Sequence, residues 1–385
     1  MRRSNRIAAM TAACAVLWAL APAAPAAPAA EGKAGDLDAQ AQQTAAEQLA
    51  AFGKGYRARV DGSRRVVFVS ALDDRHLDKT LQLLTAFTDA FRRTLGASEP
   101  AWNVTVVLPI VDDFNRLQKP FPDCVGFYDP RTRRLVSIDR GRTLLHEFTH
   151  ALHHADAAAA GQSHPLWVTE GLATLFETSR ITPSGLEPET DGRLLSVRKA
   201  VFNKKPIPLK DLLTMGPQAF MKDAALAYAE ARYLMHYLHH RDRLADFYKR
   251  FKATCGSDPA GVKALEAALG SRLYVLEPAW HQWVLSLRMP MAEDRSQDAR
   301  LGLQVQNDAR GVKVVGVVPG SAAQLAGRIR VGDVIAKFNG REVTNPVEYI
   351  AAVRDAGAMQ TVKVELFRHG RPMTVIQPLG ATSAH

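Results

Sequence analysis

The stretch LLHEFTHALHH, residues 144–154, holds four histidines and one glutamate. Residues four apart lie on the same face of an α-helix, so His146 and His150 can present two imidazole nitrogens to one ion. Glu147 follows the first of them and can reach a metal-bound water. This H-E-x-x-H pattern is typical of zinc sites, although a bare five-residue match also occurs by chance. The stretch therefore predicts a helix with two metal ligands, and a third ligand must come from elsewhere in the chain.

Two carboxylates are candidates for that third ligand. Asp156 lies six residues after the second ligand, a spacing that requires a sharp turn, and His153 stands where such a turn uses glycine. Glu170 lies in HPLWVTEGLATLFE, residues 164–177, behind an Ala/Gly-rich run and a loop with a proline. A second helix there can return across the first and place its carboxylate beside the imidazoles. Glu170 is the favoured ligand on this geometry, and Asp156 stays the alternative.

The composition is that of an ordinary globular protein. The chain has 385 residues, of which 47% are hydrophobic and 23% charged, enough for two or three domains with buried cores. The net charge of +10 is spread along the chain without a dense Lys/Arg tract. This pattern favours a solvated basic surface, and we expect no nucleic-acid partner.

Residues 1–30 are expected to form a cleaved signal peptide. MRRSNR is basic, IAAMTAACAVLWAL is apolar, and APAAPAAPAA offers several small-residue cleavage sites. The apolar run is too short to cross a bilayer comfortably. We therefore expect an exported protein, periplasmic or secreted, without an integral membrane segment after signal cleavage. Cys124 and Cys255 can pair in such a compartment, and the sequence leaves their pairing open.

The rest of the chain divides by pattern. Residues 31–59 are Ala/Gln-rich and polar and are expected to form a flexible leader, with a frayed helix as the alternative. Helical and extended periodicities then mix over residues 60–289, mostly helical from residue 208 on. A polar linker is expected at residues 290–299, followed by strands with Gly-rich turns. Within residues 60–289 the patterns predict strands at 64–71 and 102–110, a hairpin at 126–139, and helices at 76–96 and 167–179.

HEFTH followed by LWVTEGLATLF resembles the gluzincin, or thermolysin-like, superfamily of zinc metallopeptidases of the peptidase MA-like type. The resemblance covers residues 60–289. It implies an α+β catalytic domain, in which a small mixed sheet packs on the H-E-x-x-H helix, with a mainly helical subdomain. It implies Zn²⁺ held by His146, His150 and Glu170, with Glu147 as general base for peptide-bond hydrolysis.

Two further segments extend this resemblance. AYAEARYLMHYL, residues 227–238, resembles the segment whose tyrosine stabilises the oxyanion, which makes Tyr228 the candidate here. GFYDPRTRRLVSID, residues 126–139, resembles the hairpin whose edge strand pairs with an extended substrate.

The chain also departs from the pattern of this superfamily. Many gluzincins carry an aspartate four residues after the third ligand, where it orients a zinc-bound histidine. Thr174 occupies that position here. Glu177 lies one turn further along and is the candidate substitute, although a solvated surface position is expected for it. His153 and His154 match no ligand position and are expected near the helix end.

Residues 300–381 resemble a PDZ domain of the bacterial protease type, through PGSAAQLAG, VGDVIAKFNG and VELFRHGRP. Such a β-barrel-like domain adds a peptide strand to an exposed edge and holds the peptide's terminal carboxylate in a backbone nest. The resemblance implies a C-terminal peptide as ligand. The matching residues are Leu301, Gly302 and Leu303 for the nest, and Val347 and Ile350 for the side-chain pocket.

Together these features predict an α+β protein that is an exported zinc-dependent metallopeptidase, with a PDZ domain that binds substrate or a partner peptide. The alternative is a non-catalytic peptide-binding or scaffold protein that retains both folds. Glu147 favours the enzyme, because a scaffold has no need of a general base, while Thr174 keeps the alternative open.

Overall fold

The computed structural model shows a mixed α+β chain. It describes residues 34–72, 74–117, 126–288, 301–317, 321–344, 348–349, 352–353, 356 and 361–379. The expected signal peptide, the expected linker and Cys124 lie outside the described residues.

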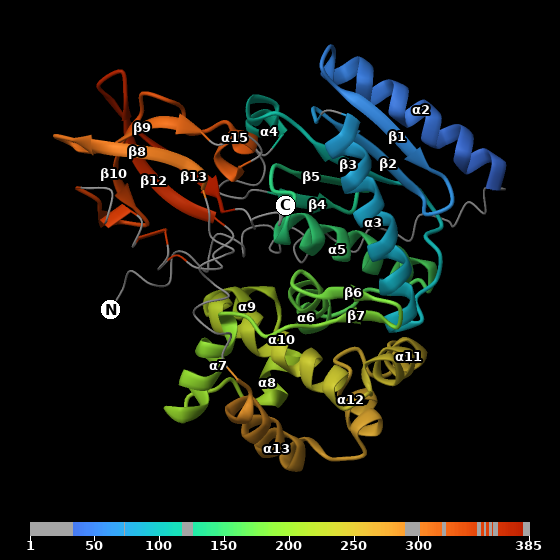
Figure 1. The fold of residues 1–385 in the computed structure, drawn as a ribbon. Coiled ribbons are helices and arrows are strands. Elements are labelled where there is room, and N and C mark those ends of the chain that lie inside the picture. Colours follow the sequence, from blue (N-terminus) through green and yellow to red (C-terminus); the bar gives the residue numbers. More distant parts are fainter. Residues whose placement is uncertain are drawn as a thin grey trace.

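A five-stranded mixed sheet forms the upper part of the molecule in Figure 1. Its strands run in the order β1-β2-β3-β5-β4, with parallel pairing of β2 to β3 and of β3 to β5 and antiparallel pairing at both ends. Strands β2 and β3 are buried at every position, as their runs of valine require in a sheet covered on both faces. The bounds are β1 (Arg57–Asp61), β2 (Val66–Ser70), β3 (Val104–Leu108), β4 (Gly126–Asp129) and β5 (Arg134–Ser137).

The two faces of this sheet contact different helices, because successive strand residues point to opposite faces. Val66 and Phe68 belong to the main core, which includes α3 (Asp74–Leu95). Val67 and Val69 face the other way, toward α2 (Ala34–Phe52). Short α4 (Val111–Leu117) covers a third cluster at the β4 edge.

Helix α2 corrects the expectation of a flexible leader at residues 31–59. Residues 34–52 are helical, and Ala41 and Ala45 are buried against β2, as Figure 1 shows for the blue helix along β1 and β2. Asn103 donates a side-chain hydrogen bond to the carbonyl of Leu37 at 2.7 Å. Alanines spaced by four form the contact face, and their small side chains give only a weak hydrophobic signal in the sequence.

Three helices form the centre of the molecule. Helix α5 (Arg142–Ala159) packs beneath β4 and β5, α6 (Leu166–Phe176) packs on α5, and α10 (Ala224–His240) packs on α6. Every residue of α6 is buried, as expected of a mostly apolar helix packed inside the molecule. Gly171 permits the close contact of α6 with α10, since a Cβ there would lie 3.0 Å from the carbonyl oxygen of Ala231.

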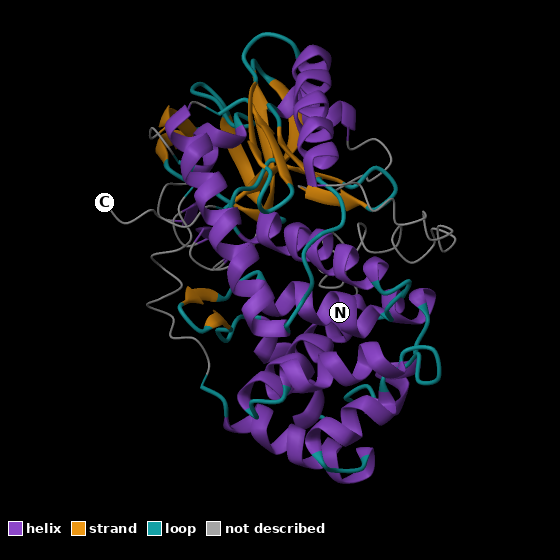
Figure 2. Ribbon diagram, turned by 90° about the vertical axis from the view of Figure 1, so that its right-hand side faces the viewer, coloured by secondary structure: helices purple, strands orange, loops and turns teal. Residues whose placement is uncertain are grey.

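The lower part of the molecule is helical, as Figure 2 shows. Trp280 is fully buried there, and its indole N–H donates to the carbonyl of Tyr233 at 3.1 Å. No helix in the described part of the chain has both the length and the apolar character to cross a bilayer. The bounds are β6 (Arg180–Thr182), β7 (Gly185–Glu187), α7 (Arg193–Phe202), α8 (Leu209–Thr214), α9 (Pro217–Lys222), α11 (Leu244–Thr254), α12 (Val262–Leu269) and α13 (Leu273–Ser286).

A second sheet with its own hydrophobic core follows at the C-terminal end. Its main order is β13-β12-β10-β9-β8, so β8 lies at an edge. Arg328, after α15, places its guanidinium 6.0 Å from the ring of Phe114 in α4, which joins the two sheet-bearing parts. The bounds are β8 (Leu303–Asp308), β9 (Gly311–Val317), α15 (Ala322–Ala326), β10 (Val334–Phe338), β11 (Arg341–Glu342), β12 (Thr361–Arg368) and β13 (Arg371–Pro378).

Candidate functional site

Helices α5 and α6 bring three potential metal ligands together. His146 Nε2 and His150 Nε2 are 3.1 Å apart, and Glu170 Oε2 lies 3.6 Å from the first and 3.5 Å from the second. Ligand atoms around a tetrahedral zinc with bonds of about 2.0–2.2 Å are separated by about 3.3–3.6 Å. The three atoms thus match one face of such a tetrahedron. In the part of the chain that the structure describes, this is the one cluster of three potential ligands at such spacing.

The surroundings of Glu170 also fit a cation. The side chain is 1% exposed, and neither carboxylate oxygen finds a hydrogen-bond partner among the described residues. Burial raises the pKa of Glu170, but the imidazoles outweigh it and lower that pKa to about 2. A buried carboxylate without donors is costly unless a positive charge meets it.

The surroundings of His146 also favour a positive charge at this position. Burial lowers its pKa, but Glu170 and Glu177 outweigh burial and raise that pKa to about 10. The two carboxylates therefore favour a positive charge at this imidazole. A metal ion competes with a proton for an imidazole nitrogen, so the donor set fits a divalent cation.

Glu147 lies beside the three candidate ligands and is 5% exposed. Burial raises its pKa, the neighbouring imidazoles oppose that rise, and Glu170 adds to it. A backbone hydrogen bond from Tyr128 in β4 also opposes the rise of this pKa. The carboxylate therefore lies between the metal-ligand helix and the edge strand of the first sheet, where it can exchange a proton with a group bound on that edge.

Glu177 differs from its expected solvated position. Its side chain is 1% exposed, and Oε2 accepts a hydrogen bond from His146 Nδ1 at 2.8 Å. A carboxylate acceptor fixes the proton on Nδ1 and leaves Nε2 free to bind a metal. Thr174 instead donates its hydroxyl to the carbonyl of Glu170 at 2.6 Å. Glu177 thus fills the orienting position that Thr174 cannot.

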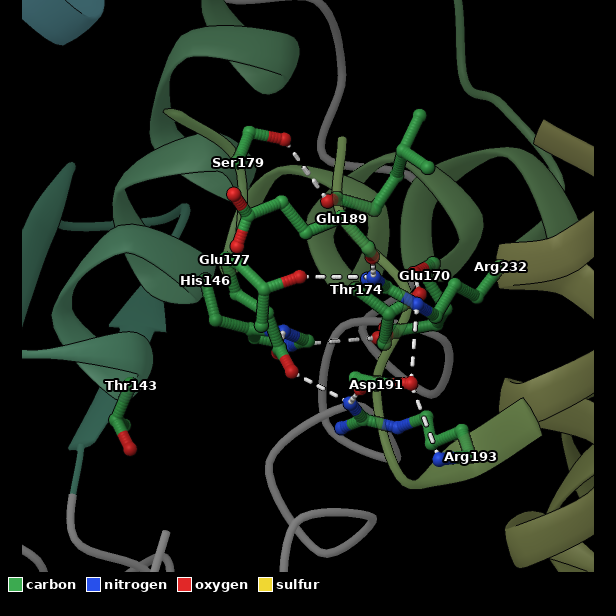
Figure 3. A network of polar contacts seen from close by, with 12 residues as sticks. Thr143, His146, Glu170, Thr174, Glu177, Ser179, Glu189, Asp191, Arg193 and Arg232 are labelled. Carbon is green, nitrogen blue, oxygen red and sulfur yellow. Dashed lines mark hydrogen bonds and ion pairs between the residues drawn. The ribbon is translucent and has the colours of Figure 1, made fainter. Parts of the chain in front are cut away.

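Further charges surround Glu177, as Figure 3 shows. Arg193 Nη1 donates to Glu177 Oε1 at 2.5 Å and to Asp191 Oδ2 at 2.8 Å. Asp191 in turn pairs with Nε of Arg232 at 3.3 Å, and the Arg232 side chain is completely buried. No pattern in the sequence indicates Arg193, Asp191 and Arg232, because they belong to different segments and form no local motif. In the sequence, the mostly apolar composition of α6 was the indication that the glutamate after its end is buried too.

Asp156, the alternative third ligand, belongs to another cluster. Its Oδ2 accepts hydrogen bonds from the hydroxyl of Tyr248 at 2.6 Å and from Lys252 Nζ at 2.8 Å. Its Oδ1 accepts one from the backbone N–H of Ser98 at 2.7 Å. Three donors already satisfy this carboxylate, and the structure does not bring it to the paired imidazoles.

Neither of the two remaining histidines of α5 is a solvated helix-end residue, because His153 is buried in the core and His154 is half-buried. His153 is 0% exposed and hydrogen-bonds His164 through ring nitrogens 2.8 Å apart. His154 Nδ1 lies 2.9 Å from the hydroxyl of Tyr128. Burial is the main cause that lowers the pKa of His154 to about 4 and of His164 to about 4, so these imidazoles are neutral near pH 7.

Tyr228 lies on α10, the helix packed against α6. Its side chain is buried, and its ring meets that of Phe220 edge to face with centroids 5.3 Å apart. The position on the third central helix is compatible with the expected role, which stays a prediction.

The expected peptide groove of the C-terminal domain is described only in part. Leu301 is buried, and its carbonyl accepts from the N–H of Ala323 at 3.0 Å. Gly302 has φ of 69°, a left-handed conformation that favours glycine, and Leu303 begins edge strand β8. Val347 and Ile350 lie outside the described residues.

Comparison with known proteins identifies the C-terminal domain. The family model described as "PDZ domain" matches residues 299–376. The chain therefore carries a PDZ domain at its C-terminal end. A search of curated proteins finds no match.

Solved structures are similar only in part. An HtrA-type protease, AlgWS227A with decapeptide, is 19% identical, with a TM-score of 0.21 over 22% of this chain and 30% of that one. The HtrA3 PDZ domain bound to a phage-derived ligand is 23% identical, with a TM-score of 0.18 over 21% of this chain and 82% of that one.

An aminopeptidase N family protein from Idiomarina loihiensis is 12% identical. Its TM-score is 0.37 over 85% of this chain and 67% of that one. The chain spans 30% of the length of the first structure, AlgWS227A. All three TM-scores are too low to support an argument about activity.

Proposed function

We propose that this chain is an exported zinc-dependent peptidase of the gluzincin type, with catalysis in residues 60–289 and peptide binding in the PDZ domain. One observation carries the proposal, the triangle of His146 Nε2, His150 Nε2 and Glu170 Oε2 with edges of 3.1–3.6 Å. The donor-free burial of Glu170 and the adjacent buried Glu147 support it.

His146, His150 and Glu170 would hold the zinc ion. Zinc at such a site supplies a Lewis acid that polarises a carbonyl and makes water acidic near pH 7. Glu147 takes the proton of the attacking water and later passes it to the leaving amine. The backbone hydrogen bond between Tyr128 and Glu147 supports a proton exchange beside this sheet edge.

The substrate lies extended along β4. This strand ends the order of the first sheet, and its one strand partner in the described residues is β5. A peptide added to the other side of β4 obtains main-chain hydrogen bonds that do not depend on its sequence. Tyr228 donates its hydroxyl to the oxygen that becomes negatively charged at the scissile carbonyl.

The PDZ domain binds a C-terminal peptide along β8. That strand is the edge of the second sheet and pairs with β9 alone in the described residues. A second strand-addition site on the same chain would hold a substrate or partner near the enzyme and raise its effective concentration.

The test is to measure zinc content and peptide hydrolysis on the full chain and on Glu147→Gln. We expect both proteins to hold one zinc and only the wild type to cleave a diverse peptide library. Glu147→Gln keeps the shape of the side chain but removes the base, so we expect kcat to fall at least about 100-fold. A folded wild type without zinc in metal-replete buffer would overturn the proposal in favour of a peptide-binding scaffold.

A further inference from the structure

A chain of alternating charges leads from the candidate metal ligand His146 into the helical part of the molecule (Figure 3). Glu177 contacts His146, Arg193 contacts Glu177, and Asp191 contacts Arg193. The series ends at Arg232.

Three of these charged side chains are buried, and the fourth, that of Arg193, is partly exposed. The side chains of Glu177, Asp191 and Arg232 are 1%, 2% and 0% exposed, and that of Arg193 is 22% exposed. Such desolvation is unfavourable unless each charge meets an opposite one at short range. The two carboxylates and two guanidiniums balance, so the network is neutral as a whole.

Arg193 connects the two carboxylates of this network. Its Nη1 alone donates to both Glu177 Oε1 and Asp191 Oδ2. Arg193 is also the first residue of α7, and Asp191 Oδ1 accepts from its backbone N–H at 3.0 Å. Hydrogen bonds therefore hold both the backbone and the guanidinium of Arg193. The position of this guanidinium in turn fixes the position of the Glu177 carboxylate.

Arg232 ties the network to α10. Its Nη2 donates to the hydroxyl of Thr178 at 2.8 Å and to the carbonyl of Glu189. The hydroxyl of Tyr233, the next residue, accepts from the N–H of Asp191 at 3.1 Å. The end of α6, the loop before α7 and the middle of α10 are thus joined by buried polar contacts on the side of Glu177 away from the metal ligands.

We propose that Arg193, supported by Asp191 and Arg232, is a positioning residue for the metal centre. Arg193 acts on zinc affinity by orienting the Glu177 carboxylate toward His146. The inference rests on the proposed function, since it assumes that His146 binds zinc. It adds that residues two and three contacts away from the ion set the affinity of this site.

The experiment measures zinc affinity by competition with a chromophoric chelator, which needs no catalytic readout. The full chain is compared with Arg193→Met, Glu177→Gln and the double variant. Replacing groups that orient a metal ligand costs about 10–100-fold in affinity, and we expect Glu177→Gln in that range. Arg193→Met should weaken zinc binding about 5–10-fold, because Glu177 remains but loses its anchor.

The double variant separates positioning from general destabilisation. If Arg193 acts through Glu177, Arg193→Met should change zinc affinity less than about twofold once Glu177 is glutamine. Arg193→Lys keeps the charge and offers one nitrogen to both carboxylates, so it should restore part of the affinity. Should Arg193→Met fail to fold, Arg193→Lys alone and with Glu177→Gln still tests the coupling.

Arg368→Met provides the matched control. Arg368 pairs with Asp333 in the PDZ domain with side-chain exposures of 20% and 2%, close to the 22% and 2% of Arg193 and Asp191. We expect it to leave zinc affinity unchanged. Wild-type affinity in Arg193→Met, or an equal loss in both Glu177 backgrounds, would overturn the inference alone. A wild type that binds no zinc would overturn the proposed function and the inference together.

Discussion

Glu170 and Asp156 are two buried carboxylates with opposite surroundings. Glu170 has no hydrogen-bond donor among the described residues, whereas Asp156 accepts from Tyr248, Lys252 and Ser98. A carboxylate with three donors is a structural anion, and one without donors is ready for a cation. Sequence spacing left both open as the third ligand, and the donor geometry separates them.

This contrast predicts different effects of replacing the two carboxylates. Glu170→Gln should lower zinc affinity at least about 100-fold, since it removes a proposed ligand rather than a group behind one. Asp156→Asn should keep one zinc but lower the free energy of unfolding by about 2 kcal/mol, because buried donors lose their acceptor. Metal analysis and chemical denaturation of both variants check this. Loss of zinc from Asp156→Asn with normal zinc in Glu170→Gln would reverse the assignment.

The hydrogen bonds of Asp156 lead us to expect that stability depends on pH. Burial raises the pKa of Asp156, but its hydrogen bonds to Lys252, Tyr248 and Ser98 lower that pKa by a larger amount. The net pKa is therefore below the ordinary value. Its stabilisation is therefore complete above the unfolded pKa of about 3.9 and is lost as the pH falls through the lower folded pKa. Denaturation curves at pH 7 and at pH 3 should show that Asp156→Asn costs less stability at the lower pH. An equal cost at both pH values would contradict this.

Tyr228 carries a prediction about catalysis alone. Tyr228→Phe removes the hydroxyl and keeps the ring that packs on Phe220. Loss of an oxyanion donor costs about 100-fold in kcat, with KM and zinc content nearly unchanged. Steady-state kinetics on a peptide that the wild type cleaves provides the measurement. A wild-type kcat in Tyr228→Phe would remove this residue from the mechanism.

At the scale of elements, the contact between α6 and α10 holds the third ligand in place. Glu170 precedes Gly171, where a Cβ would lie 2.9 Å from Met235 Cγ and 3.0 Å from the carbonyl oxygen of Ala231. One of these neighbours is backbone of a helix and cannot move alone. Any side chain at Gly171 therefore shifts α6 as a unit, and Glu170 with it.

Gly171→Ala should accordingly lower the free energy of unfolding by about 1–3 kcal/mol, the usual cost of overpacking, and weaken zinc binding. Gly256→Ala is the matched control, because a Cβ at Gly256 meets nothing within 4 Å. We expect that control to leave zinc affinity unchanged. Thermal unfolding and chelator competition measure both effects, and normal zinc binding in Gly171→Ala would show that α6 adapts without moving its ligand.

The elements that the sequence predicted are those with a strong local period. Strands expected at residues 64–71 and 102–110 are β2 and β3, and the helix expected at 76–96 is α3. The helix with His146 and His150 was predicted because H-E-x-x-H is itself a helical spacing, and the helix expected at 167–179 is α6. The packing of α2 was not predicted because alanines form its contact face. Glu177 was named as a substitute for the expected aspartate, but its burial was not predicted because its partner Arg193 belongs to another element.

At the scale of the whole molecule, two hydrophobic cores are separate. One runs from the first sheet through the helices, and the other lies inside the PDZ domain, with no shared residue among those described. The sequence predicted this division from the change of pattern after residue 289. It could not predict the contact of Arg328 with Phe114, since a pairing across domains depends on docking rather than on periodicity.

Separate cores predict separate unfolding transitions, and zinc should act on only one of them. A ligand that binds only the folded state stabilises it by RT ln(1 + [L]/Kd), about 4 kcal/mol at a thousand times Kd. Chelation of zinc should therefore lower the Tm of the larger transition in differential scanning calorimetry and leave that of the PDZ domain. Arg368→Met should do the reverse, because it breaks the buried pair with Asp333. If chelation shifts both transitions equally, the contact of Arg328 with Phe114 couples the domains, and the PDZ domain is part of one cooperative unit with the metal centre.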